Sequence, residues 1–143
     1  MNCKGVLIVE DDLPIREAIS ILLKDEGIEV QCTTNGKEAL EYLENCAEDD
    51  FPGLILLDIM MPVMDGFKFL EIYNDSERYK RAPVVVMSAN SSFTETAVRD
   101  YTVGQLKKPV SMDDLINIVR RACTVGPHDH MKKNSEFSGS ASL

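Results

Sequence analysis

The sequence contains no hydrophobic run long enough to cross a membrane. None of its apolar stretches approaches the ~20 residues that a transmembrane helix needs. The apolar run at residues 5–9 is also too short for the hydrophobic region of a signal peptide, and three acidic residues follow it directly. We therefore expect a cytoplasmic protein that makes no contact with a membrane.

Basic residues are scarce relative to acidic ones. The chain has 143 residues with 15 Lys and Arg against 24 Asp and Glu, which gives a formal net charge of −9. A surface this acidic repels the phosphates of nucleic acids and of anionic lipids. We therefore expect no direct binding to nucleic acid, and we expect the surface to attract Mg²⁺ and basic partner proteins.

No two cysteines have the CxxC spacing of a redox or zinc site. The four cysteines, Cys3, Cys32, Cys46 and Cys123, are widely separated in the chain. We interpret them as reduced thiols that serve as small apolar residues. A disulfide or a zinc site is the alternative interpretation.

Short apolar runs alternate with segments of helical periodicity along residues 1–123. The expected strands are residues 6–9, 29–33, 54–57, 84–87 and 103–107. A segment with apolar residues on one helical face follows each strand, and the expected capping residues are Asn35, Asp65, Ser92 and Ser111. The pattern predicts an α/β domain of (βα)5 type, a doubly wound parallel sheet with helices on both faces.

Individual elements carry further expectations. Pro14 suits the first turn of the first helix and Gly27 suits its end. The helix after Ser92 is expected to be short, and the strand at 103–107 is poor in apolar residues, which favours a sheet edge. Residues 124–143 have little apolar content and predict a flexible tail, so the domain is expected to comprise residues 1–123. His128 and His130 in this tail are interpreted as solvated residues rather than metal ligands.

Polar side chains follow the carboxyl ends of four expected strands, where sites form in open parallel sheets. They are Glu10, Asp11 and Asp12 after the first strand, Asp58 after the third, Ser88 after the fourth and Lys108 after the fifth. Each residue taken alone suits a helix cap or a loop. Together, crowded carboxylates favour a hard divalent cation such as Mg²⁺, and a lysine and a hydroxyl suit a phosphate, so the set predicts a phosphoryl-transfer site.

Four motifs carry a resemblance to a known family. They are VLIVEDD at residues 6–12, LILLDIMMPVMDG at 54–66, VVVMSA at 84–89 and LKKP at 106–109. In this order and spacing they resemble the receiver domain of bacterial two-component response regulators, over residues 4–123. The resemblance implies a flavodoxin-like fold with strand order 2-1-3-4-5.

The resemblance also implies a role for each site residue. Asp58 would be the phosphoacceptor, Glu10 and Asp11 would bind Mg²⁺ together with Asp58, and the backbone carbonyl of Met60 would be a further ligand. Ser88 would be the switch hydroxyl. Lys108 would bind the phosphoryl oxygens, and its peptide bond to Pro109 would be cis. We further expect that Lys108→Ala leaves Mg²⁺ binding nearly unchanged, so that Lys108 has little influence on it, and that the variant weakens the phosphorylated state. Asp12 is interpreted as a helix cap.

The implied function is signalling rather than turnover of a substrate. A receiver takes its phosphoryl group from the phosphohistidine of a sensor histidine kinase or a phosphotransfer protein. It catalyses only its own phosphorylation and dephosphorylation, and it controls a downstream effector protein.

The sequence departs from the family pattern at two places. Gln105 occupies a position that is aromatic in many members, and the stretch at residues 90–104 is slightly short. The chain is interpreted as a stand-alone receiver or as one cut from a larger regulator.

Three alternatives remain open at this point. Haloacid-dehalogenase phosphatases also use a strand-end Asp, but they need a second Asp two residues later, where this chain has Met60. Flavodoxins need a phosphate loop after the first strand, where Glu10, Asp11 and Asp12 would repel the phosphate. An interaction module that is never phosphorylated is the third alternative.

Overall fold

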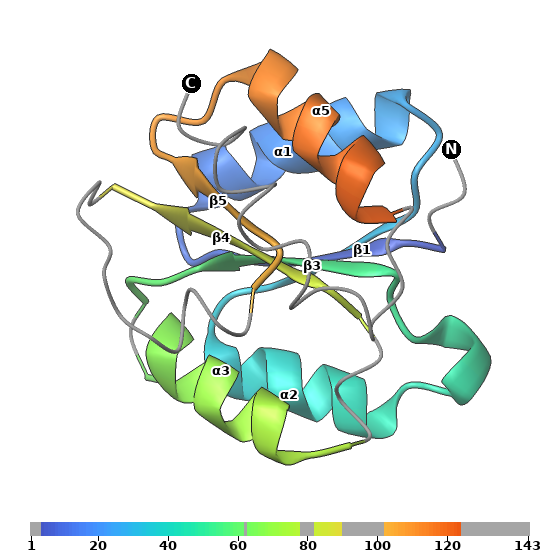
Figure 1. The fold of residues 1–143 in the computed structure, drawn as a ribbon, viewed down its shortest axis with the longest axis vertical. Coiled ribbons are helices and arrows are strands. Elements are labelled where there is room, and N and C mark those ends of the chain that lie inside the picture. The colour runs from blue at the N-terminus through green and yellow to red at the C-terminus, as the bar shows by residue number, and fades with distance from the viewer. Residues whose placement is uncertain (1–3, 62, 78–81, 90–101, 124–143) are drawn as a thin grey trace.

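The fold is a five-stranded parallel sheet between two layers of helices, as a computed structural model shows (Figure 1). The structure describes residues 4–61, 63–77, 82–89 and 102–123. The strands are β1 (Val6–Val9), β2 (Val30–Thr33), β3 (Leu54–Asp58), β4 (Val84–Ser88) and β5 (Gly104–Lys107). The order β2-β1-β3-β4-β5 confirms the predicted topology and places β5 at an edge.

Four α-helices and one short 3₁₀ helix surround the sheet in the described part of the chain. The α-helices are α1 (Leu13–Asp25), α2 (Gly36–Asn45), α3 (Gly66–Asp75) and α5 (Met112–Cys123). The 3₁₀ helix η1 (Glu48–Asp50) was not predicted from the sequence. The helix expected after Ser92 and the tail expected at residues 124–143 fall outside the described residues.

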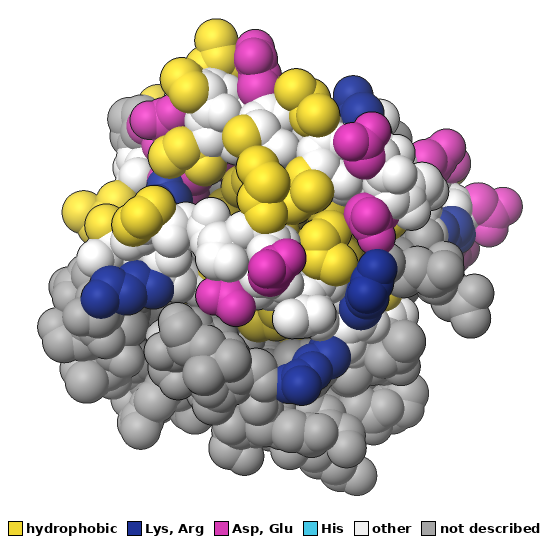
Figure 2. Space-filling model, turned by 90° about the horizontal axis from the view of Figure 1, so that it is seen from above, with side chains coloured by type: hydrophobic (Ala, Val, Ile, Leu, Met, Phe, Trp, Pro, Cys, Tyr) yellow, Lys and Arg dark blue, Asp and Glu magenta, His cyan; other side chains and the backbone are white. Residues whose placement is uncertain are grey.

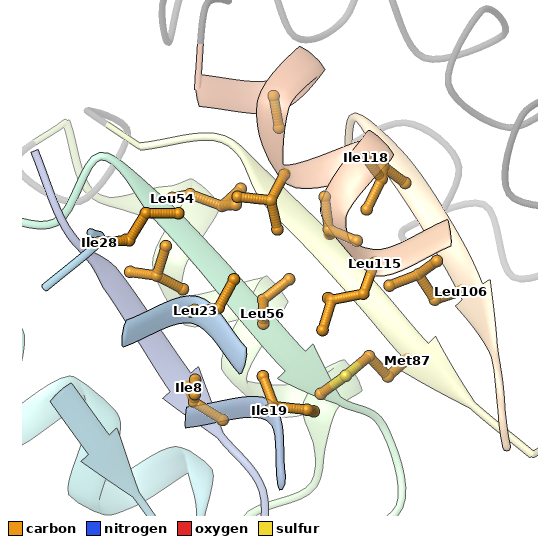
Figure 3. Packing of buried hydrophobic residues seen from close by; sticks show 14 of the residues in the cluster. Ile8, Ile19, Leu23, Ile28, Leu54, Leu56, Met87, Leu106, Leu115 and Ile118 are labelled. Carbon is orange, nitrogen blue, oxygen red and sulfur yellow. The ribbon is translucent and has the colours of Figure 1, made fainter. Parts of the chain in front are cut away.

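The two faces of the sheet bury two separate hydrophobic clusters. Figure 1 shows α1 and α5 on one face of the sheet and α2 and α3 on the other. Because side chains alternate along a strand, Ile8 and Leu56 pack under α1 and α5, whereas Leu7 and Leu57 pack under α2 and α3. Figure 3 shows the first cluster, in which the strand residues meet Ile19, Leu23, Leu115 and Ile118. Burial on both faces explains why β1 and β3 are continuous apolar runs.

Local capping residues fix where the helices begin and end. The side chains of Asp12, Asn35, Asp65 and Ser111 each accept a hydrogen bond from a backbone N–H three residues later, at 2.8–3.3 Å. Gly27 follows α1 with a φ of +80°, a conformation that suits glycine. These contacts confirm the predicted caps at the four helices.

Some details of the helices differ from the expectation. Helical periodicity predicts that Phe67, Leu70 and Tyr73 of α3 and Leu115, Ile116 and Val119 of α5 face the core. Phe69 and Ile118 are buried as well, which that spacing does not predict. Ala47, which the same spacing assigns to the inner face of α2, lies beyond the end of this helix and is exposed. Cys32 and Cys46 are free thiols, as expected, but Cys123 forms a disulfide. The interpretation of all four cysteines as reduced is therefore wrong for Cys123, because separation in sequence does not reveal which sulfur atoms meet in space.

In the part of the chain that the structure describes, none of the helices has the length and apolar character needed to span a membrane.

Candidate functional site

The candidate site lies at the carboxyl edge of the sheet, where β1, β3, β4 and β5 end. Parallel pairing sets Val9 opposite Leu57 and Asp58 opposite Met87, so the residues after these positions meet at one edge. Asp58 is the last residue of β3, and Glu10 directly follows β1. The shared register therefore brings the predicted residues together without any special loop.

Three carboxylates converge at this edge. One carboxylate oxygen from each of Glu10, Asp11 and Asp58 lies within 4.8 Å of the other two. Glu10 and Asp58 are buried, whereas Asp11 is exposed. Carboxylate oxygens at this spacing form a group that can hold a hard divalent cation. The chemistry of the donor set therefore fits Mg²⁺.

Lys108 brings the compensating positive charge. Its Nζ lies 2.6 Å from Glu10 Oε1 and 3.4 Å from Asp58 Oδ1. Its backbone N–H donates to the carbonyl of Ser88 at 2.8 Å, which ties the end of β5 to the end of β4. The Lys108–Pro109 peptide bond is cis, as predicted.

Ser88 and Met60 complete the predicted set. Ser88 is the last residue of β4 and is buried next to the strand that carries Asp58. The backbone N–H of Met60 donates to Asp58 Oδ1 at 3.3 Å, while the Met60 side chain is 69% exposed. The neighbouring Met61 and Met64 pack into the cluster under α2 and α3, as expected. All six predicted site residues thus lie at one edge of the sheet.

Contacts to Glu10 were not predicted from the sequence. Glu10 Oε2 accepts a hydrogen bond from the backbone N–H of Asp12 at 3.2 Å, and Arg16 Nη1 donates to the Glu10 carbonyl at 2.7 Å. These bonds hold Glu10 against the start of α1. The position of Arg16 on the first turns of α1 gave no distinctive signal, because an arginine on a helix is ordinarily a solvated residue.

The loop between β3 and α3 is held closely beneath Asp58. The N–H of Gly66 donates to the Ile59 carbonyl at 2.8 Å, and the N–H of Gly36 donates to the Met64 carbonyl at 3.1 Å. A Cβ atom on Gly66 would lie 2.9 Å from the Asp58 carbonyl oxygen. The loop therefore needs glycine at position 66 to support the strand end.

Val63 adopts a backbone conformation that is unfavourable for its side chain. Its φ is +69° and its side chain is 79% exposed. A β-branched residue in the left-handed region costs about 1–2 kcal/mol, and asparagine tolerates this region better. We predict that Val63→Asn raises the free energy of unfolding by about 1 kcal/mol. Thermal unfolding should show a Tm higher by a few degrees, and an unchanged or lower Tm would contradict the prediction.

The surroundings of Asp58 alter its acidity. Burial raises the pKa of Asp58, the neighbouring Glu10 carboxylate raises it further, and Lys108 and the Met60 N–H oppose the rise, so that the pKa is about 7. Burial lowers the pKa of Lys108, but Glu10 and Asp58 more than offset this, and the net shift is upward. In the absence of a cation, the site therefore favours a proton on Asp58 and a charge on Lys108.

This raised pKa predicts how stability depends on pH without metal. The pKa of Asp58 rises from 3.8 to about 7 on folding, so the folded state binds the proton more tightly than the unfolded state. The stabilisation is complete below pH 3.8 and is lost as the pH rises through about 7. Asp58→Asn should therefore be more stable than the wild type above about pH 7, with a difference that shrinks toward pH 4. Thermal unfolding with a chelator over this range tests the prediction, and a difference independent of pH would refute it.

Known proteins resemble the chain in both sequence and structure. The model of the response regulator receiver domain matches residues 6–120. The response regulator Rre1 of Synechocystis sp. is 34% identical over 120 residues, covering 81% of this chain and 50% of Rre1. The regulatory protein AtoC of Escherichia coli is 37% identical over 120 residues, covering 82% of this chain and 24% of AtoC. The chain thus spans half or less of the length of these two relatives.

A solved structure supports the same assignment. The chemotaxis response regulator CheY4 of Vibrio cholerae aligns with a TM-score of 0.73 and 29% sequence identity, covering 82% of this chain and 97% of CheY4. The family model covers the four motifs and all the site residues. The chain therefore belongs to the response regulator receiver domain family.

Proposed function

We propose that this receiver domain accepts a phosphoryl group on Asp58 and changes conformation to control a partner protein. The observation that carries the proposal is the position of Asp58 at the end of β3, among two further carboxylates and the ammonium of Lys108. A buried carboxylate at a strand end is costly unless it is compensated. Phosphoryl transfer would explain why the chain keeps a buried carboxylate at this strand end despite its cost in stability.

The side chains at the carboxyl edge of the sheet would have different roles in phosphoryl transfer. An oxygen of Asp58 attacks the phosphorus of a phosphohistidine, so that one P–O bond forms as the P–N bond breaks and the electron pair stays on the imidazole. Glu10, Asp11, Asp58 and the Met60 carbonyl would hold Mg²⁺, which supplies neutralisation of the charge on the phosphoryl oxygens. Lys108 and the hydroxyl of Ser88 would contact those oxygens once the group is on Asp58.

The same residues would account for signalling rather than turnover. The chain would catalyse only its own phosphorylation and the later hydrolysis of its acyl phosphate. The phosphoryl group would shift a pre-existing conformational equilibrium, with a coupling of about 1–3 kcal/mol. Ser88 and the loop around Lys108 would transmit the shift toward β5 and α5, where a downstream effector would bind. Gln105, half-buried in β5, stands where an aromatic switch would lie, so backbone movement is the route we favour.

The phosphodonor would dock on the face formed by α1 and α5. Figure 2 shows hydrophobic side chains gathered on this face. A hollow of about 200 Å³ lies there beside Lys108, and its apolar lining comes from α1, from the segment between β5 and α5, and from the first turn of α5. Leu13 and Met112 are exposed at the first turns of these helices. The donor that we propose is a sensor histidine kinase or a phosphotransfer protein.

We predict that Ala18→Arg slows transfer from a protein donor by at least about tenfold, because Ala18 is exposed and lines this hollow. Phosphorylation by acetyl phosphate should stay within about twofold, since a small donor needs no docking surface. Lys37→Ala, an exposed change on α2, should affect neither rate. Equal slowing with both donors would contradict the docking site.

Binding of a phosphoryl mimic tests the proposed function. In a sample already saturated with Mg²⁺, adding beryllofluoride should further shift the backbone NMR signals of Asp58, Ser88 and Lys108 first, followed by signals along β5 and α5. Asp58→Asn should show none of these changes. Changes confined to α2 and α3 would rule out the proposed route.

A further inference from the structure

We propose that Lys108 competes with the divalent cation for Glu10, so that the lysine must leave Glu10 before the cation binds there. The proposal rests on the proposed function, because it concerns how the same site is regulated. It assigns Lys108 two successive partners, first the Glu10 carboxylate and then the phosphoryl oxygens.

The contact between Lys108 and Glu10 is the shorter of the two ion pairs. Nζ lies 2.6 Å from Glu10 Oε1 but 3.4 Å from Asp58 Oδ1. The Glu10 side chain is fully buried, and only 16% of the Lys108 side chain is exposed. A charge pair this buried is compensated by its partner more than by water, so Glu10 needs another cation when Lys108 departs.

The two oxygens of Glu10 have different surroundings. Oε2 accepts the hydrogen bond from the N–H of Asp12. Oε1 is also buried, but among the described residues no donor has the geometry of a hydrogen bond to it. The compensation at Oε1 is therefore the charge of Lys108. Glu10 is one of the three residues whose carboxylate oxygens could together hold a metal. The ammonium of Lys108 therefore already contacts a carboxylate that the cation would need.

Release from Glu10 leaves Lys108 well placed for its second role. The ammonium is already 3.4 Å from Asp58, the residue that would carry the phosphoryl group. The exchange therefore links cation binding to the freeing of the residue that contacts the phosphoryl oxygens.

This proposal predicts the opposite of the expectation that Lys108 has little influence on Mg²⁺ binding. Removing its charge should strengthen the binding of Mg²⁺, because the cation then meets no competitor and no like charge. Isothermal titration of the full chain with MgCl₂, without any phosphodonor, measures this directly. Lys108→Met should bind Mg²⁺ at least about tenfold more tightly than the wild type.

Lys107→Met is the matched control, since it removes the same charge from the adjacent, exposed position. Its Mg²⁺ affinity should stay within about twofold of the wild type, because an exposed charge is screened by water and salt. Lys108→Gln should reproduce the effect of Lys108→Met if the latter folds poorly. In the wild type itself, the NMR signals of the Lys108 side-chain Cε should shift on saturation with Mg²⁺, whereas those of Lys107 should not.

Two results separate this inference from the proposed function. Wild-type binding of Mg²⁺ with no tightening in Lys108→Met and Lys108→Gln, or an equal gain in Lys107→Met, would overturn the inference alone. A wild type that binds no Mg²⁺ would overturn the proposed function together with the inference.

Discussion

Asp58→Asn is expected to abolish phosphorylation by acetyl phosphate while the fold remains intact. Asparagine keeps the size of the side chain but lacks the anionic oxygen that attacks phosphorus. Removing a negative charge from a crowded acidic edge does not endanger the fold, because burial and Glu10 already disfavour that charge. Intact-mass measurement after incubation with Mg²⁺ and acetyl phosphate should detect no phosphoryl group on the variant.

Asp12→Asn is the control for this experiment. Asp12 lies two residues from Glu10, but its Oδ1 accepts the N–H of Ile15 at the start of α1. Asparagine caps a helix about as well as aspartate, so the control should fold and be phosphorylated within about twofold of the wild-type rate. Loss of phosphorylation in Asp12→Asn, or its persistence in Asp58→Asn, would mean that the acceptor is wrongly assigned.

Gly66→Ala is expected to lower stability by about 1–3 kcal/mol and to disturb the site. The new Cβ would lie 2.6 Å from Ile59 Cδ1, 2.7 Å from Ile59 Cα and 2.9 Å from the Asp58 carbonyl oxygen. Two of these atoms belong to the backbone of the strand end, so relief requires moving Asp58 itself. Overpacking of this kind costs about 1–3 kcal/mol, occasionally more, which corresponds to a Tm lower by several degrees.

Gly27→Ala separates the loss of stability from the loss of function. Gly27 has a φ of +80° and open space around its Cβ position, so the substitution should cost about 1 kcal/mol through backbone strain alone. Phosphorylation by acetyl phosphate should be normal in Gly27→Ala and markedly slower in Gly66→Ala at a temperature where both are folded. Normal phosphorylation in Gly66→Ala would show that the loop does not position Asp58.

Features that depend on neighbouring residues were predictable from the sequence. The strands β1 and β3 are short apolar runs bounded by polar residues, and the caps at Asp12, Asn35 and Asp65 act within one helical turn. The edge at which the site forms followed from the parallel order of the strands, because carboxyl ends of parallel strands lie together. The family resemblance supplied the strand order.

Features that depend on distant residues or on backbone detail were not predictable. The pairing of Lys108 with Glu10 rather than mainly with Asp58 is a matter of side-chain reach across the sheet edge. The left-handed conformation of Val63 arises from the path of the loop, although its sequence favours an extended conformation. The burial of Phe69 and Ile118 depends on how far each helix is rotated against the sheet, which periodicity defines only approximately.

The central claim is that Asp58 accepts a phosphoryl group with the help of a cation held by its acidic neighbours. Mass spectrometry of the wild-type chain after treatment with acetyl phosphate tests it most directly, with one sample in Mg²⁺ and one in a chelator. The account predicts a single phosphoryl group in Mg²⁺, located on the peptide that contains Asp58, and none in the chelator. A phosphoryl group that forms equally well without Mg²⁺, or that lies on another residue, would contradict it.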